Sequence, residues 1–172
     1  MFEEDIFFIA DGHSLKGKFF LPDQSAGLSP FLCFCHGIPA KPYDPADKGY
    51  EEIAQKFCKE GFAAFIFNFR GAGESEGDFD ISGWARDLEA AIDIMYNHPR
   101  IDRKRFAILG SSAGAAVAVY HAARDKRITH LISLACPASF SFITNPARIE
   151  EFLEGCRRVG IIRSRGFPKN KA

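Results

Sequence analysis

The stretch from residue 105 to residue 118 constrains the fold more than any other part of the chain. It begins with a short apolar run, Phe106–Leu109, which predicts a strand buried on both faces. It continues through Gly110–Gly114 into Ala-rich sequence that predicts a helix. A turn this tight between strand and helix would hold Ser112 in a strained backbone conformation, with its hydroxyl pointing away from the sheet.

The glycines two positions either side of Ser112 have a steric explanation. A side chain at Gly110 or Gly114 would collide with the neighbouring strand or helix. The helix that follows directs its free N–H groups toward whatever lies over Ser112. Two interpretations are open, a nucleophilic serine and an ordinary Gly-rich turn of an α/β protein. The strand–turn–helix setting favours the nucleophile.

Apolar runs and helical segments alternate along the chain after an N-terminal hairpin. Two strands, 5–10 and 14–21, are joined by Asp11-Gly12-His13, a typical hairpin turn. Further strands are predicted at 30–35, 62–67, 105–109 and 128–135, and helices at 49–60, 83–97, directly after Ser112, and at 146–154. This order predicts an α/β fold with a mostly parallel sheet, an antiparallel N-terminal hairpin and helices on both faces. We expect a core over residues 1–138, with 139–172 beginning a lid insertion or forming a C-terminal tail.

Three conspicuous loops follow predicted parallel strands. They are His36–Pro39, Asn68–Gly77 and Gly110–Gly114. Since ligands of such sheets bind at the carboxyl ends of the strands, all three loops are expected to border one site. The second loop contains Arg70-Gly71-Ala72-Gly73, but four carboxylates follow it within ten residues, which disfavours a bound dinucleotide.

Composition and charge exclude several other classes of function. The 172 residues carry 22 Lys and Arg against 22 Asp and Glu, which gives no argument for nucleic acid or a membrane surface. Residues 155–172 contain six Lys or Arg and no acid, and a solvated or unfinished segment is favoured over a nucleic-acid arm because no aromatic residues are interleaved. The five cysteines have no metal-binding spacing, so no metal or cofactor is expected. Reduced thiols, an acidic N-terminus and no spanning apolar run favour a cytoplasmic protein.

Over about residues 5–138 the three loops together resemble those of the α/β-hydrolase superfamily, of the serine esterase or peptidase type. The resemblance implies that Ser112 is a nucleophile that cleaves an ester, amide or thioester of a small-molecule or peptide acyl substrate. It also implies an oxyanion hole formed by the backbone N–H groups of Ile38 and Ala113, since Pro39 has no N–H. His36, Gly37 and Arg70 are expected to shape the site, together with Gly110 and Gly114.

The resemblance places the catalytic acid and histidine after later strands of the sheet, which this chain is expected to lack. His121 lies nine residues along the same predicted helix as Ser112. His13, His98 and His130 are expected at or near the opposite end of the sheet. His36 lies at the right edge, but its implied role is to shape the oxyanion loop rather than to act as a base.

Two explanations for the missing residues are open. The chain is the N-terminal portion of a longer enzyme, or it is a complete protein without a triad. A sheet that stops after six strands exposes a hydrophobic edge, which favours the first explanation. In that case this chain by itself should have little or no turnover. A non-catalytic binding module is the competing hypothesis, and a histidine donated by another chain of a homo-oligomer is the third.

Overall fold

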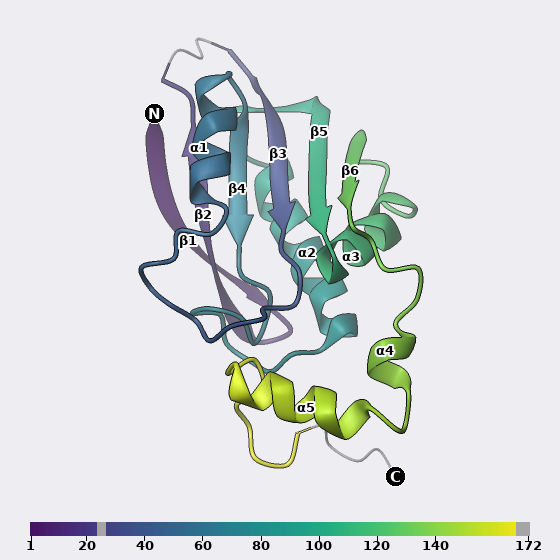
Figure 1. Cartoon of the computed structure of the whole chain (residues 1–172). Helices are drawn as coiled ribbons and strands as arrows, with labels where there is room; N and C mark the ends of the chain where they lie inside the picture. Colours follow the sequence, from purple (N-terminus) through teal and green to yellow (C-terminus); the bar gives the residue numbers. More distant parts are fainter. Residues whose placement is uncertain (24–26, 168–172) are drawn as a thin grey trace.

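A six-stranded sheet carries the fold, with the strand order β1-β2-β4-β3-β5-β6 (Figure 1). The computed structural model describes residues 1–23 and 27–167. The strands are β1 (Phe2–Ala10), β2 (His13–Leu21), β3 (Ser29–Cys35), β4 (Ala63–Phe67), β5 (Ile101–Ser111) and β6 (His130–Leu134). β4, β3, β5 and β6 run parallel, whereas β1 pairs antiparallel with β2 and β2 antiparallel with β4. The predicted fold class is confirmed.

Helices cover both faces of this sheet (Figure 1). α1 (Glu51–Lys59) packs on one face against β4, and α2 (Ile81–Tyr96) and α3 (Ala113–Ala122) pack together on the other. Two helices follow β6, the short α4 (Ser141–Thr144) and α5 (Ile149–Arg158). α5 lies across the carboxyl ends of the parallel strands (Figure 1). None of the helices in the described parts of the chain is both long and apolar enough to cross a membrane.

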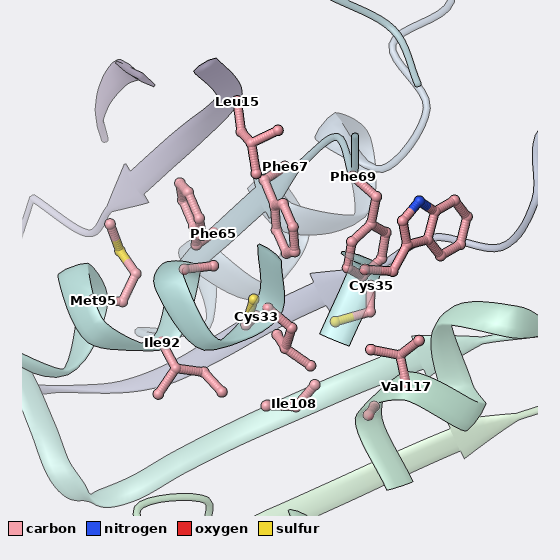
Figure 2. Packing of buried hydrophobic residues seen from close by; sticks show 14 of the residues in the cluster. Leu15, Cys33, Cys35, Phe65, Phe67, Phe69, Ile92, Met95, Ile108 and Val117 are labelled. Atoms are coloured by element: carbon pink, nitrogen blue, oxygen red, sulfur yellow. The ribbon is translucent and has the colours of Figure 1, made fainter. Parts of the chain in front are cut away.

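The core is divided by the sheet because successive strand residues point to opposite faces. In β3, Phe31, Cys33 and Cys35 belong to the large cluster under α2 and α3, whereas Leu32 and Phe34 belong to the smaller cluster under α1. Figure 2 shows the large cluster, in which phenylalanines of β4 pack against residues of α2 and α3. Each fully buried Phe stabilises the fold by roughly 1.5–3 kcal/mol relative to an exposed one. Most of the chain's phenylalanines are thereby accounted for by the core.

Several boundaries differ from those predicted. β5 begins at Ile101 rather than at residue 105, because Ile101 already pairs with Ser29 before a register shift to the Phe31–Phe106 pair. Residues 103–105 are exposed, so no apolar run marks that part of the strand. α5 begins at Ile149 and extends to Arg158, past the predicted end at residue 154, and α4 was not predicted.

β6 forms one edge of the sheet, and within the described residues it pairs with β5 alone. All five of its residues are exposed, including three large apolar side chains: Leu131, Ile132 and Leu134. The apolar edge expected after the sixth strand is therefore present.

Candidate active site

Ser112 occupies the turn between β5 and α3 as predicted. Its backbone has φ 52° and ψ −124°, a conformation in which a residue with a side chain is strained. Its N–H donates to the Leu134 carbonyl at 2.9 Å, which ties the turn to β6. Its side chain is exposed, and no described residue forms a hydrogen bond with its hydroxyl.

Close backbone packing explains the glycines around this turn. A Cβ on Gly110 would lie 2.5 Å from the Cα of Ala115, and a Cβ on Gly114 would lie 2.2 Å from the carbonyl oxygen of His36. Both approaches are shorter than any side chain tolerates, so only glycine permits the turn. The steric prediction for both positions is confirmed.

The loop after β3 touches Ser112 directly. A Cβ on Gly37 would lie 2.9 Å from the Ser112 Cβ and 3.5 Å from its Oγ, so Gly37 lies against the serine. Within residues 1–23 and 27–167, the N–H groups of Ile38 and Ala113 donate to no acceptor. Ala113 is the first residue of α3, where N–H groups have no partner within the helix. Two free donors thus lie on the chain immediately beside the serine.

His36 has both ring nitrogens engaged away from Ser112. Nδ1 lies 2.6 Å from the Gly37 carbonyl oxygen and Nε2 accepts from the Phe69 N–H at 3.1 Å. These partners require a neutral ring with the proton on Nδ1. Burial lowers the pKa of His36, although the bond to Gly37 opposes that shift, so the ring stays neutral at physiological pH. His36 joins the loops after β3 and β4.

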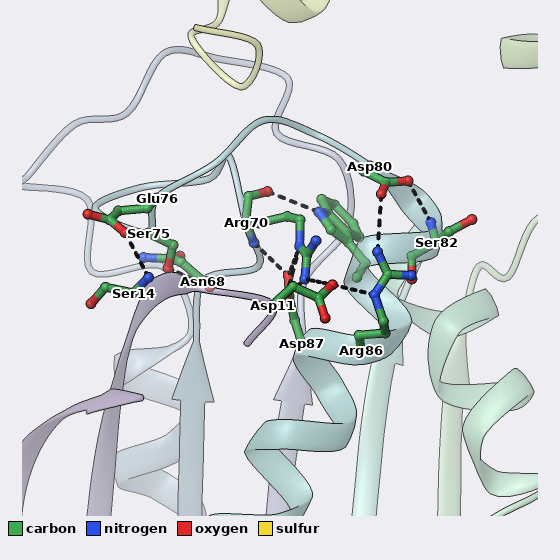
Figure 3. A network of polar contacts seen from close by, with 11 residues as sticks. Asp11, Ser14, Asn68, Arg70, Ser75, Glu76, Asp80, Ser82, Arg86 and Asp87 are labelled. Atoms are coloured by element: carbon green, nitrogen blue, oxygen red, sulfur yellow. Dashed lines mark hydrogen bonds and ion pairs between the residues drawn. The ribbon is translucent and has the colours of Figure 1, made fainter. Parts of the chain in front are cut away.

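Arg70 is buried and holds the loop after β4 onto α2 (Figure 3). Its guanidinium donates to Asp87 at 2.6 and 2.9 Å and to Asp11 at 3.0 Å, and its backbone N–H donates to Asp87 at 2.8 Å. Burial raises the pKa of Asp87, and the bonds from Arg70 act against this rise. The Trp84 indole donates to the Arg70 carbonyl at 3.1 Å. Asp87 was not predicted, although a carboxylate three residues after Trp84 on the apolar stripe of a helix was a usable signal.

The prediction for His13 was wrong. β2 runs antiparallel to β4, with Gly17 opposite Phe67, so the turn before β2 lies at the carboxyl edge of the parallel strands. A Cβ on Gly77 would lie 3.3 Å from the His13 ring, which places His13 against the end of the loop after β4. His98 packs on Phe19 and His121 is buried on α3. No described histidine forms a hydrogen bond with Ser112.

The expectation of a solvated or unfinished C-terminal segment was wrong for part of residues 155–167, which packs against the core. Cys156, Ile161 and Ile162 are buried in the large cluster, at 3%, 2% and 3% exposure. The Arg163 guanidinium donates to the carbonyls of Gly71, Gly73 and Ser75 at 3.1, 2.8 and 3.0 Å. Residues 168–172 of the basic stretch lie outside the described residues.

Two cavities flank the Gly37 loop. A cavity of about 730 Å³ lies between this loop, β2 and residues 41–51, with His36 and Gly37 in its wall. Two ion pairs line it, Lys18 with Glu51 at 2.7 Å and Lys16 with Glu74 at 2.9 Å. A second cavity, of about 330 Å³, lies between Ile38–Ala40 and α5. Ser112 lines neither cavity, but Gly37, which touches Ser112, lies in the wall of the first, and its neighbour Ile38 lies in the wall of the second. No described group of three or more His, Cys, Asp or Glu residues could hold a metal ion.

Comparison with known proteins gives partial relatives whose names describe different activities. A polyketide transferase of Stachybotrys chlorohalonatus is 30% identical over 174 residues, which cover 98% of this chain and 55% of the relative. A thiohydrolase of Aspergillus aculeatus is 30% identical over 145 residues, covering 79% and 42%. The quorum-quenching protein AidA of Acinetobacter baumannii is 35% identical over 99 residues, covering 55% and 32%. The chain thus spans between about a third and just over half of the length of these relatives.

Solved structures agree with this relationship. The α/β-hydrolase GrgF from a Penicillium species superposes with a TM-score of 0.73 at 28% identity, covering 90% of this chain and 52% of that one. An esterase of Pyrococcus furiosus has a TM-score of 0.68 at 22% identity over 89% of this chain and 59% of its own, which supports the fold. A family model described as serine aminopeptidase, S33, matches residues 32–158, a range that contains the loops after β3, β4 and β5. The chain therefore belongs to the S33 serine aminopeptidase family of α/β-hydrolases.

Proposed function

We propose that this chain carries the nucleophile of a serine hydrolase that forms an acyl-enzyme on Ser112. The observation that carries the proposal is the strained, exposed position of Ser112 at the first turn of α3, in contact with the Gly37 loop. Strain at an exposed serine is retained where the rest of the fold requires it, and such positions are concentrated in active sites. The names of relatives, a thiohydrolase and a polyketide transferase, favour an ester or thioester as substrate.

The reaction has two steps. Ser112 Oγ attacks the carbonyl carbon while its proton passes to a base, and the bond to the leaving oxygen or sulfur breaks as the leaving group takes that proton. Water then attacks the acyl-serine and releases the acid. In a transfer reaction an alcohol or thiol takes the place of water.

The oxyanion of each tetrahedral intermediate would lie between the N–H groups of Ile38 and Ala113. Both donors are free of other partners within the described residues, and both belong to backbone held by close packing. Donors that are aimed in advance at developing charge are worth roughly 3–4 kcal/mol each in the transition state.

A base for Ser112 is the part that the described residues do not supply. His36 is occupied at both nitrogens, and the other four histidines make their contacts elsewhere. We therefore expect this chain alone to turn over substrate very slowly, and the base to come from outside the described residues or from another chain. The alternative is a non-catalytic binding module, which is favoured because no described residue forms a hydrogen bond with the Ser112 hydroxyl.

We also propose that the protein is cytoplasmic. All five cysteines are free thiols, and burial raises the pKa of Cys58 and Cys156 to about 11 each. Such thiols are protonated and inert at neutral pH, in keeping with a reducing compartment.

Labelling with a fluorophosphonate followed by intact mass measurement tests the proposal. A single adduct that maps to Ser112 supports an activated serine, and Ser112→Ala should abolish it. Ser111→Ala is the matched control, because Ser111 is the neighbouring hydroxyl at the end of β5 and should leave labelling unchanged. If the Ser112→Ala protein still hydrolyses esters, the assignment of the nucleophile is wrong. Ligand binding without any adduct would favour the binding module.

A further inference from the structure

The segment that follows α5 is fastened to the loop after β4 by an unusual set of bonds. The Arg163 side chain donates to the carbonyls of Gly71, Gly73 and Ser75 on that loop, and to the Gly160 carbonyl at 2.8 Å. The planar guanidinium of Arg163 thus joins two chain segments through hydrogen bonds to four backbone carbonyls rather than through an ion pair.

Asp78 makes the reciprocal half of this attachment. Its Oδ1 accepts from the backbone N–H groups of Arg163 and Ser164 at 2.5 and 3.0 Å. The Phe79 N–H donates to the Ile161 carbonyl at 2.7 Å. Two chain segments about 85 residues apart are thus joined by side-chain and backbone bonds in both directions. We call this set of bonds the Arg163 clasp.

The clasp fixes the position of α5, because the turn that follows the helix is held at Ile161 and Arg163. The inner side of α5 packs through Cys156, which is 3% exposed, and through Phe152, whose ring lies 5.7 Å from that of Phe79. α5 is in turn one wall of the 330 Å³ cavity, whose opposite wall is Ile38–Ala40. The width of that cavity therefore depends on where the clasp holds α5.

The lining of this cavity suits an apolar group. Its less exposed members are one glycine, one buried thiol and four apolar side chains: Gly155, Cys156, Ile38, Pro39, Phe152 and Val159. The charged residues in its wall, Arg148, Glu151 and Arg158, are exposed and so lie toward solvent. Ile38 links the cavity to the serine, since its neighbour Gly37 touches Ser112.

We infer that Arg163 is a positioning residue that, with Asp78, holds α5 as the wall of a binding pocket for an apolar acyl chain beside Ser112. The assignment of that chain to the acyl group of a substrate rests on the proposed function. The pocket and the clasp themselves rest only on the contacts described above.

Two measurements on the full chain test this inference. The first is hydrogen–deuterium exchange, in which Arg163→Ala should speed exchange at least tenfold over residues 149–162 while leaving β3 and β5 unchanged. The second is fluorescence titration with dansyl-undecanoic acid, a non-covalent apolar probe. Wild type should bind it saturably, Arg163→Ala at least fivefold more weakly, and Arg163→Lys at an intermediate strength, because one ammonium group reaches fewer of the carbonyls.

Three further variants separate the pocket from general stability. Arg165→Ala is the matched control, because Arg165 is exposed and makes no hydrogen bond to a described residue, and it should behave as wild type. Asp78→Asn keeps an acceptor for the two backbone N–H groups. Hydrogen–deuterium exchange over residues 149–162 should therefore be slower in Asp78→Asn than in Asp78→Ala. Gly155 lines the cavity, and the nearest atom to an added Cβ there is 3.9 Å away, so Gly155→Leu should abolish probe binding without loosening α5.

Several results would overturn the inference. They are unchanged exchange over α5 in Arg163→Ala, no binding of the probe to wild type, or full binding to Gly155→Leu. Faster exchange with unchanged probe affinity would also overturn it, because the clasp would then be structural alone. Fluorophosphonate labelling is read separately. Probe binding that follows the clasp without a Ser112 adduct would support the pocket while favouring the non-catalytic binding module, and the reverse result would refute the pocket alone.

Discussion

Backbone packing holds the chain around Ser112, whereas side-chain charges hold the loop from residue 68 to residue 77. At the serine, Gly114 lies against the carbonyls of His36 and Cys35 with no room for a single carbon atom. At the neighbouring loop, Arg70 is held by Asp87 and Asp11 through five hydrogen bonds with distances from 2.6 to 3.2 Å. Both regions border the same edge of the sheet.

The difference teaches what each region tolerates. Steric contact between backbone atoms cannot relax without moving β3 or α3. A substitution there should therefore destabilise the whole fold. Removing one member of a charge network should lower the free energy of unfolding by an amount that depends on how deeply that member is buried. Substitutions in the two regions should therefore differ in both size and gradation.

The largest effect is expected at the serine turn, from Gly114→Ala. The added Cβ would lie 2.2 Å from the His36 carbonyl oxygen and 2.5 Å from that of Cys35, and neither atom belongs to a flexible side chain. We expect a loss of at least about 4 kcal/mol in the free energy of unfolding, which is exceptional for one methyl group. Urea denaturation measures it. Gly27→Ala is the control, because nothing lies within 4 Å of its Cβ position, and a large loss in both variants would contradict the steric account.

The next effect is expected in the charge network, from Asp87→Ala. Asp87 is 0% exposed and Arg70 4%, so the variant leaves a buried guanidinium whose remaining carboxylate partner is Asp11. Breaking a buried pair in this way costs about 3 kcal/mol. Asp87→Asn retains acceptor oxygen and volume and should lose less. Equal losses for the two variants, measured by thermal unfolding, would show that the lost carboxylate charge, rather than packing or the remaining acceptor oxygen, determines the effect.

These two regions also mark how far the sequence alone could lead. The glycines around Ser112 were predicted because the strand–turn–helix motif marks them in the local sequence, although the carbonyls that Gly114 approaches belong to the distant residues Cys35 and His36. Arg163 was missed because its partners lie 88 to 92 residues away and no local pattern records such a contact. His13 was placed at the wrong end because a hairpin motif identifies the turn but not the strand that the hairpin pairs with, which here is β4. The order of strands and the serine turn were thus predictable, whereas the contacts that fasten the surrounding loops were not.

A smaller, pH-dependent effect is expected where the two regions meet, at His36. Its pKa is lowered by burial from the usual 6.5, so the neutral ring is favoured in the folded state. The contribution of the neutral His36 ring to the free energy of unfolding is fully present above pH 6.5. It is lost as the pH falls through the lower pKa that His36 has in the folded protein. Protonation removes the acceptor for the Phe69 N–H, a net loss of about 1 kcal/mol. Urea midpoints at pH 7.5 and 5 measure the loss, and His36→Gln, which cannot titrate, should show a smaller difference. An identical pH dependence would assign the effect to His98 and His121, whose pKa values burial also lowers.

The smallest effect is expected at Asp11, the second carboxylate partner of Arg70. Its side chain is 39% exposed, and its pKa is lowered by hydrogen bonds from Arg86 and Arg70. Asp11→Asn preserves the positive φ of 48°, which Asn also tolerates, and removes only the charge. An exposed ion pair contributes about 0.5 kcal/mol, so the variant should unfold almost as wild type does, and 1 M NaCl should remove the remaining difference. A loss as large as that of Asp87→Ala would mean that Arg70 depends equally on both carboxylates. Burial would then not determine how much each carboxylate contributes to the free energy of unfolding.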